Sequence, residues 1–169
     1  MKDKRSKINV REIRKAFTRA AIGSILVFIL CILYLIFNPY LKEAAVLNTF
    51  KKDVESMKAI VQEWNSLNYP VMFINRKMYG NDIIDVGYRP DEYIHIDENY
   101  SHYFEYLFAK KKYEYIMKDD NDVYFTKYAS FGNGYGVAFF ADGDKSQNEL
   151  IVSSKEIDNF DGWYFYIMR

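Results

Sequence analysis

The feature that most constrains this chain is an uncharged stretch between Arg19 and Lys42. Its centre reads AAIGSILVFILCILYLIF. At about 1.5 Å per residue, a helix of this length spans the roughly 30 Å hydrocarbon core of a bilayer. Tyr34 and Tyr40 fall towards its far end, and rings with a polar tip favour the membrane interface. We therefore expect a transmembrane helix over residues 20–40.

Charge is distributed unevenly on the two sides of this stretch. Residues 1–19 carry eight Lys/Arg and two Asp/Glu, a net charge of +6. The chain beyond the stretch holds the other 15 of the 23 basic residues and the other 21 of the 23 acidic ones, a net charge of −6. Because Lys and Arg accumulate on the cytoplasmic side, residues 1–19 are expected to form a basic cytoplasmic tail. Residues 41–169 are then extracytoplasmic.

A cleaved signal peptide is the alternative to an anchor. Signal peptides have an apolar region of about 7–15 residues followed by a small-x-small cleavage site. Here the apolar run is longer, and residues 37–40, Phe-Asn-Pro-Tyr, provide no such site. The pattern therefore indicates a single-pass, uncleaved signal anchor in the cell membrane.

The only cysteine, Cys31, lies inside the run. The outer segment therefore contains no disulfide, which is common in bacteria and favours a bacterial source.

The composition of the outer segment excludes two classes of protein. The chain is 18% aromatic, with 16 Tyr and 13 Phe, whereas disordered segments are poor in aromatic residues. One packed domain is therefore expected over residues 41–169. Nucleic-acid binding requires a basic surface that contacts phosphates. The acidic outer segment does not provide one, so we expect no nucleic-acid partner.

A long amphipathic helix is predicted directly after the break at Asn38-Pro39, over residues 41–67. Its apolar positions are spaced 3, 4, 3, 4, 3, which is a heptad pattern. We interpret this stripe as a face packed on a sheet, and the seam of a homodimer is the alternative. The stripe consists of Leu47, Phe50, Val54, Met57, Val61 and Trp64.

Short runs rich in aromatic and β-branched residues predict strands along the rest of the chain. Asp, Asn and Gly separate the later runs, as in an antiparallel meander. A short helix is expected over residues 102–111, capped by Asn99 or Ser101. A long helix on such a sheet makes an α+β fold with a terminal β-meander. The predicted strands are residues 71–75, 83–88, 93–96, 113–118, 123–130, 135–141, 149–154 and 163–168.

Tyrosines on both faces of the predicted C-terminal strands are the candidate interaction site. If one face of the sheet packs on the helix, many rings remain on the other, and exposed aromatic clusters often mark binding surfaces. The alternative is a second layer, built from residues 71–96, that covers this face. The tyrosines concerned are Tyr113, Tyr115, Tyr124, Tyr128, Tyr135, Tyr164 and Tyr166.

No motif in the sequence indicates catalysis, a cofactor or a metal. His95 and His102 lack the i, i+4 spacing of a zinc-binding helix. The acidic runs at 119–122 and 142–144 lack the Gly and Glu positions of a calcium loop, and tight turns explain them. The glycine-rich segment 132–136 precedes a predicted strand, whereas a phosphate loop precedes a helix. We therefore expect no catalytic residues, no cofactor and no metal site, and hence no enzyme.

The final predicted strand begins within the segment Gly162-Trp163-Tyr164. With this segment and its order of elements, the chain resembles extracellular PAS-like sensor domains of the Cache type. This resemblance covers residues 41–169 and implies a ligand-binding sensor. Such receptors normally have a second membrane span and a cytoplasmic output domain, which this sequence lacks. The resemblance therefore implies that a bound ligand is reported through another protein.

The segment from Lys15 to Thr18, followed by the apolar run and Pro39, is similar to type IV pilin-like proteins. Two positions depart from that family: Ala16 stands where it has Gly, and Ala21 where it has Glu.

From all these patterns we expect a membrane-anchored, non-catalytic binding, sensing or interaction domain that acts with a partner membrane protein. A structural subunit of a cell-surface or secretion assembly is the alternative, and a membrane-bound enzyme is the third.

Overall fold

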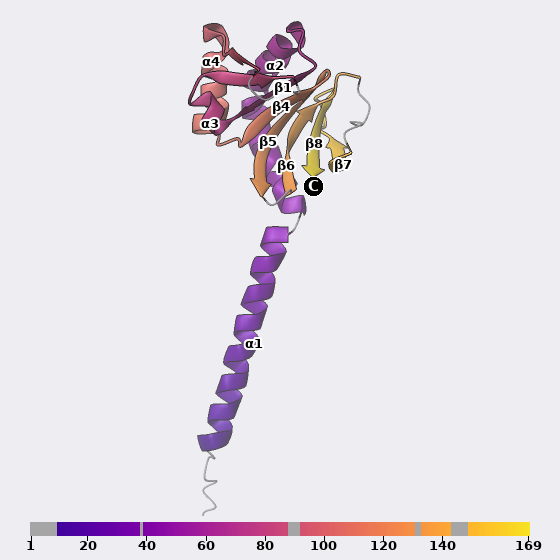
Figure 1. The fold of residues 1–169 in the computed structure, drawn as a ribbon. Helices are drawn as coiled ribbons and strands as arrows, with labels where there is room; N and C mark the ends of the chain where they lie inside the picture. The colour runs from indigo at the N-terminus through magenta and orange to yellow at the C-terminus, as the bar shows by residue number, and fades with distance from the viewer. Residues whose placement is uncertain (1–9, 38, 88–91, 131–132, 143–148) are drawn as a thin grey trace, which may run out of the picture. The chain divides into compact units, whose positions relative to one another are not determined.

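The structure is a computed structural model that describes residues 10–37, 39–87, 92–130, 133–142 and 149–169 (Figure 1). The chain divides into two compact units, Met1–Leu41 and Lys42–Arg169. The first contains one helix and the second contains an α+β fold. Each unit is considered by itself below.

The described part of the first unit contains helix α1, Val10–Phe37, and the first three residues of helix α2. Helix α1 begins within the basic segment and not at residue 20, so Arg14, Lys15 and Arg19 occupy its first turns. Over Arg14–Tyr34, 21 residues, it is long and apolar enough to cross a membrane, and none of this stretch is buried. It is the one helix of that kind in the described part of the chain.

Helix α2, Pro39–Ser66, closely matches the long helix predicted from the heptad pattern. It begins at proline, the residue type whose missing backbone N–H costs nothing in the first turn of a helix. Residue 38, the other half of the predicted break, lies outside the described residues. From Lys42 onward α2 belongs to the second unit.

All eight predicted strands are present in one antiparallel sheet. Its order is β3-β2-β1-β4-β5-β6-β8-β7, and the C-terminal strand β8 has the predicted bounds (Figure 1). The strands are β1 Val71–Asn75, β2 Ile83–Val86, β3 Tyr93–His95, β4 Tyr115–Asp119, β5 Asp122–Ser130, β6 Asn133–Phe139, β7 Ile151–Glu156 and β8 Trp163–Met168.

The sheet differs from expectation in two respects. The segment over residues 71–96 does not form a second layer, because β1 pairs with β4 and extends the same sheet. In addition, β8 lies between β6 and β7, so the chain order of a meander ends at β6. Eleven residues, 140–150, connect Phe139 to Ile151, and a connection of that length does not impose the adjacency of a tight hairpin.

Three short helical segments connect the first strands. Helix α3, Arg76–Tyr79, connects β1 to β2, and the Asn75 side chain accepts hydrogen bonds from the N–H groups of Lys77 and Met78. Helix α4, Glu98–Glu105, continues into a π-helical turn, η1, Tyr106–Lys110. The predicted helix therefore exists but begins four residues early. Asp97, and not Asn99 or Ser101, is its cap, since its carboxylate accepts from the N–H of Asn99.

The main core lies between α2 and one face of the sheet. Phe50 contacts Phe160 and Trp163 with ring centroids 5.0 and 5.4 Å apart. At the other end of α2, Trp64 packs on Phe104 of α4. Figure 1 shows α2 behind β5 and β6 in that view. The long helix therefore covers the sheet face that carries Met72, Ile74, Ile116, Val123, Phe125, Val137, Trp163 and Phe165.

Candidate functional site

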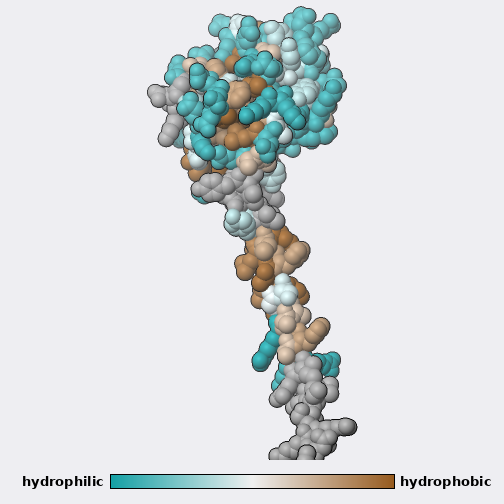
Figure 2. All heavy atoms as spheres, turned by 180° about the vertical axis from the view of Figure 1, so that it is seen from behind, coloured by the Kyte–Doolittle hydropathy of each residue, from teal (hydrophilic) through white to brown (hydrophobic). Residues whose placement is uncertain are grey.

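The apolar side chains of α1 are exposed along most of its length. Phe28 and Leu30 expose 66% and 63% of their surface, and Arg14, Lys15 and Arg19 are exposed as well. Figure 2 shows the two parts of the helix as a hydrophobic stretch and a hydrophilic one. Among the side chains of α1 that the structure describes, the exposed large apolar ones are Phe17, Ile22, Ile25, Leu26, Val27, Phe28, Ile29, Leu30, Ile32, Leu33 and Tyr34.

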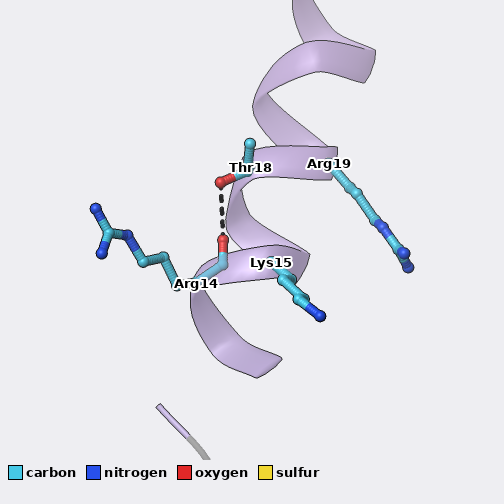
Figure 3. Close-up of a pocket in the computed structure, with 4 residues that line it drawn as sticks. All are labelled: Arg14, Lys15, Thr18 and Arg19. Carbon is cyan, nitrogen blue, oxygen red and sulfur yellow. Dashed lines mark hydrogen bonds between the residues drawn. The ribbon is translucent and has the colours of Figure 1, made fainter. Parts of the chain in front are cut away.

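The concave surface at the start of α1 is lined by Arg14, Lys15, Thr18 and Arg19. Figure 3 shows Arg14 extending to one side of the helix, and Lys15 and Arg19 to the other. The hydroxyl of Thr18 donates a hydrogen bond to the carbonyl oxygen of Arg14, 2.9 Å away, and so is satisfied within the helix. All lining residues come from one helix, so this is an open, positively charged helix surface and not an enclosed pocket.

The seven candidate tyrosines do not form one exposed face. Tyr113, Tyr124, Tyr164 and Tyr166 are buried, and Tyr115 and Tyr135 are partly buried. Only Tyr128 is exposed, and its ring stacks on that of Tyr135 with centroids 5.4 Å apart. These side chains separate into three groups with different surroundings: a second core, a buried charge cluster and a surface pair.

The second core lies on the sheet face opposite α2. Across β5, β6 and β8, Tyr124 pairs with Ala138 and Ala138 with Tyr164. In the next rung Gly136 stands between Thr126 and Tyr166. The small residues of β6 therefore leave room for rings from both neighbouring strands. This cluster comprises Tyr124, Ala138, Phe140, Tyr164 and Tyr166, with Met117, Ile151 and Met168 at its margin.

Side chains from non-adjacent strands meet on this face of the sheet. The hydroxyl of Tyr115 on β4 lies 3.0 Å from the sulfur of Met168 on β8, although β5 and β6 lie between those strands. Strands are spaced about 4.8 Å apart, so a flat sheet would separate these backbones by about 14 Å. A Cβ on Gly136 would lie 2.0 Å from the carbonyl oxygen of Phe125, so only glycine permits this close approach of β6 to β5.

The buried charge cluster is centred on Asp53 of α2, which is fully buried. Its carboxylate accepts hydrogen bonds from the hydroxyls of Tyr113, at 3.0 Å, and Tyr106, at 3.2 Å. The ammonium group of Lys111 lies 2.9 Å from it. Lys127 places its ammonium group 4.2 Å from the centre of the Tyr113 ring and donates to the carbonyl of Lys111. These contacts join α2 to η1 and to the short segment between η1 and β4.

Electrostatics in this cluster follow from burial and from the single carboxylate. Burial, followed by the negative charge of Asp53, raises the pKa of Tyr113 above its usual range. The hydrogen bond to Asp53 raises the pKa of Lys111. Desolvation lowers the pKa of Lys127. The arrangement neutralises a buried carboxylate.

The apolar stripe of α2 is in the main core. Phe50, Val54, Met57, Val61 and Trp64 are buried, and Leu47 is partly buried against the same cluster. Within this chain the stripe therefore already packs on the sheet, as the first of its two interpretations requires.

The two histidines are separate from each other in the structure. The Nδ1 atom of His95 lies 3.1 Å from the carbonyl oxygen of Asp82, and His102 packs on the ring of Tyr103.

In the first acidic run, a carboxylate oxygen of Asp122 accepts a hydrogen bond from the N–H of Ala141. Residues 143–148, which include the last two positions of the second acidic run, lie outside the described residues. Within the described ranges no three His, Cys, Asp or Glu side chains are placed to hold a metal ion.

Asp53 was not singled out in the sequence, yet a signal for it exists. Positions 46, 50, 53, 57, 60 and 64 follow the spacing 4, 3, 4, 3, 4, and all are buried. An acidic residue at the centre of a heptad pattern predicts a buried carboxylate that needs partners.

Comparison with known proteins identifies no relative: no family model, curated protein or solved structure matches this chain.

Proposed function

We propose that this protein is a non-catalytic interaction domain anchored in the cell membrane by α1 and acting with a partner membrane protein. In this proposal residues 1–19 are cytoplasmic and the second unit is extracytoplasmic. The observation that carries the anchor is the exposure of the apolar side chains of α1. Function in this proposal depends on where the second unit is held and on which surface it presents.

Energetics support the anchor. Full burial of a large apolar side chain is worth about 1.5–3 kcal/mol, so the partly to largely exposed apolar side chains of α1 together forgo on the order of 10 kcal/mol. That is comparable to the roughly 5–15 kcal/mol by which a whole domain is stable. A hydrocarbon environment removes this cost. The basic residues of the first turns then favour the cytoplasmic side for the N-terminus.

The non-catalytic part of the proposal rests on the buried polar groups. Apart from tyrosines, the buried polar or charged side chains in the described part of the chain are Asp53, Lys118 and Thr126. Each has a hydrogen-bonding partner inside the fold. A catalytic acid or base needs access to a substrate proton, and these groups are occupied by structural contacts.

Anchoring is tested with the full chain carrying one epitope at each end. We expect the protein to stay in the membrane after alkaline carbonate extraction. External protease should remove the C-terminal epitope from spheroplasts and spare the N-terminal one. Replacing Arg14, Lys15 and Arg19 with Glu should raise the fraction of inverted molecules. Release by carbonate, or a mature N-terminus after residue 37, would contradict the proposal.

The partner is tested by extracting the full chain in mild detergent and measuring the mass and composition of the particle. A particle containing one companion membrane protein in fixed stoichiometry is expected. A polymer of this chain alone would instead favour the structural subunit of a surface assembly. A lone monomer would contradict a stable partner.

A further inference from the structure

Four large hydrophobic side chains are exposed in the described part of the second unit, and three of them lie at one end of the sheet. They are Tyr128, Leu150 and Val152, which expose 46%, 52% and 55% of their surface. The fourth, Tyr93, exposes 55% but lies on β3, the opposite edge strand.

Strand register brings these residues to the same end. Tyr128 on β5 pairs with Tyr135 on β6, and Tyr135 pairs with Ile167 on β8. One rung further, Gly134 pairs with Met168, and Met168 with Ile151 on β7. Leu150 and Val152 flank Ile151 in the chain. The exposed apolar residues therefore lie at or next to the last paired positions at one end of β5, β6, β8 and β7.

The start of α2 lies at this end of the sheet too. The ammonium group of Lys42 lies 5.5 Å from the centre of the Tyr135 ring. Glu43 pairs with Lys155 of β7 at 2.6 Å. Figure 1 shows the C-terminus beside the start of α2 as well. We call the surface formed by Lys42, Tyr128, Tyr135, Leu150 and Val152 the Lys42 end.

Chain connectivity limits how far the Lys42 end can lie from the end of α1. Lys42 follows Phe37 by five residues, which reach at most about 18 Å even when fully extended. This limit holds whatever the orientation of the second unit. If α1 spans the bilayer, Lys42 is therefore within reach of the outer headgroup layer.

We propose that the Lys42 end rests in the headgroup layer of the bilayer that holds α1. The inference depends on the anchoring proposed above. Tyrosine rings with polar tips and isolated aliphatic side chains suit the boundary between water and hydrocarbon. Glu43 and Lys155 neutralise each other at this end, and the outer segment is acidic overall. The contact therefore needs no anionic lipid.

The contact has a structural consequence for the proposed partner. Lipid contact along the last rungs of β5, β6, β8 and β7 would limit rotation of the second unit above the membrane. The opposite edge strand β3, with Tyr93, then faces away from that contact and is open to other molecules.

The test uses the full chain in phosphatidylcholine nanodiscs with an environment-sensitive fluorophore on a single cysteine. The native Cys31 in α1 reports the anchor. In a Cys31→Ser background, Tyr128→Cys and Val152→Cys report the Lys42 end. Tyr93→Cys, equally exposed, is the matched control. Each labelled protein must show the melting temperature of the unlabelled parent. Quenching is measured with a nitroxide on the lipid headgroup.

We expect several-fold stronger quenching at positions 128 and 152 than at position 93, with blue-shifted emission at the first two. Equal, weak quenching at all three positions, with the label on Cys31 buried in lipid, would overturn this inference and leave the anchor intact. A label on Cys31 that remains in water would overturn the anchor itself, and this inference with it.

Discussion

The carboxylate of Asp53 and the hydroxyl of Tyr113 are 3.0 Å apart and both are buried. They join the middle of α2 to the residue that leads into β4. Because Lys111 also contacts Asp53 at 2.9 Å, the pair is part of a neutralised group and not an isolated buried charge. Removing either partner would leave the other groups without compensation in the core.

A fragment of residues 42–169 is expected to be soluble and folded without reductants or metals. Its two hydrophobic clusters lie within the second unit, and the only cysteine lies outside it. Size-exclusion chromatography and circular dichroism test this expectation, with and without a chelator. Recovery of aggregates alone, or folding that the chelator abolishes, would argue against an independent unit.

Asp53→Ala in this fragment is expected to destabilise the fold by about 3–5 kcal/mol, the range for breaking a buried ion pair from one side. Lys111 and Tyr113 would lose their common acceptor. Urea unfolding measures the change. Glu55→Ala is the control, because its ion pair with Lys58 is exposed and should matter by less than about 0.5 kcal/mol. Equal effects of the two substitutions would show that the cluster has no special role.

Alkaline pH should unfold the fragment through its buried tyrosines. Burial raises the pKa values of Tyr113 and Tyr166 above 10.0, so the folded state retains their protons when the unfolded state has lost them. Their contribution to stability is complete below pH 10 and falls as the pH rises further. Lys118 and Lys127 have the opposite effect on stability, because burial lowers their pKa values from 10.5. Their effect makes stability rise with pH, and it ends once the pH passes 10.5.

The measurement is ultraviolet absorbance of ionised tyrosine, recorded beside circular dichroism during an alkaline titration. Some tyrosines should ionise only as the fold is lost. Tyr166→Phe should shift the transition to higher pH, whereas Tyr128→Phe, at an exposed position, should not. Smooth ionisation of every tyrosine in the folded fragment would refute this account.

The local elements were predictable because their signals are local. The uncharged run predicted the core of α1, and the heptad spacing predicted α2 to within two residues at its start and one at its end. Alternating aromatic and β-branched residues located the strands, and β8 was predicted with its observed bounds. Such patterns depend on neighbouring residues only, so one sequence contains them in full.

Long-range features were not predictable in the same way. The insertion of β8 between β6 and β7 depends on pairing across a long connection, for which no local signal exists. The burial of the tyrosine rings depends on packing across β5, β6 and β8, which strand alternation does not encode. Gly136 permits the close approach of β6 to β5, but a glycine in a strand indicates only that a bulge, bend or close approach is present.

Lys118 is expected to stabilise the C-terminal end of α2. Its buried ammonium group donates to the carbonyl oxygen of Trp64 at 2.7 Å, and to that of Leu67 at 3.4 Å. Carbonyls in the last turn of a helix have no partner within the helix, and α2 has no basic residue of its own there. The side chain from β4 therefore acts as a distant cap.

Lys118→Met keeps most of the side-chain volume and removes the donor, so it should cost about 1–3 kcal/mol of unfolding free energy. Lys58→Met, at an exposed position of α2, should be nearly neutral. A second readout separates the charge from the packing. Because burial lowers the pKa of Lys118, the unfolded parent binds more protons than the folded one just below pH 10.5, and its stability rises with pH there. The Met variant should lose part of that rise, and an unchanged pH profile would mean that the amine is solvated.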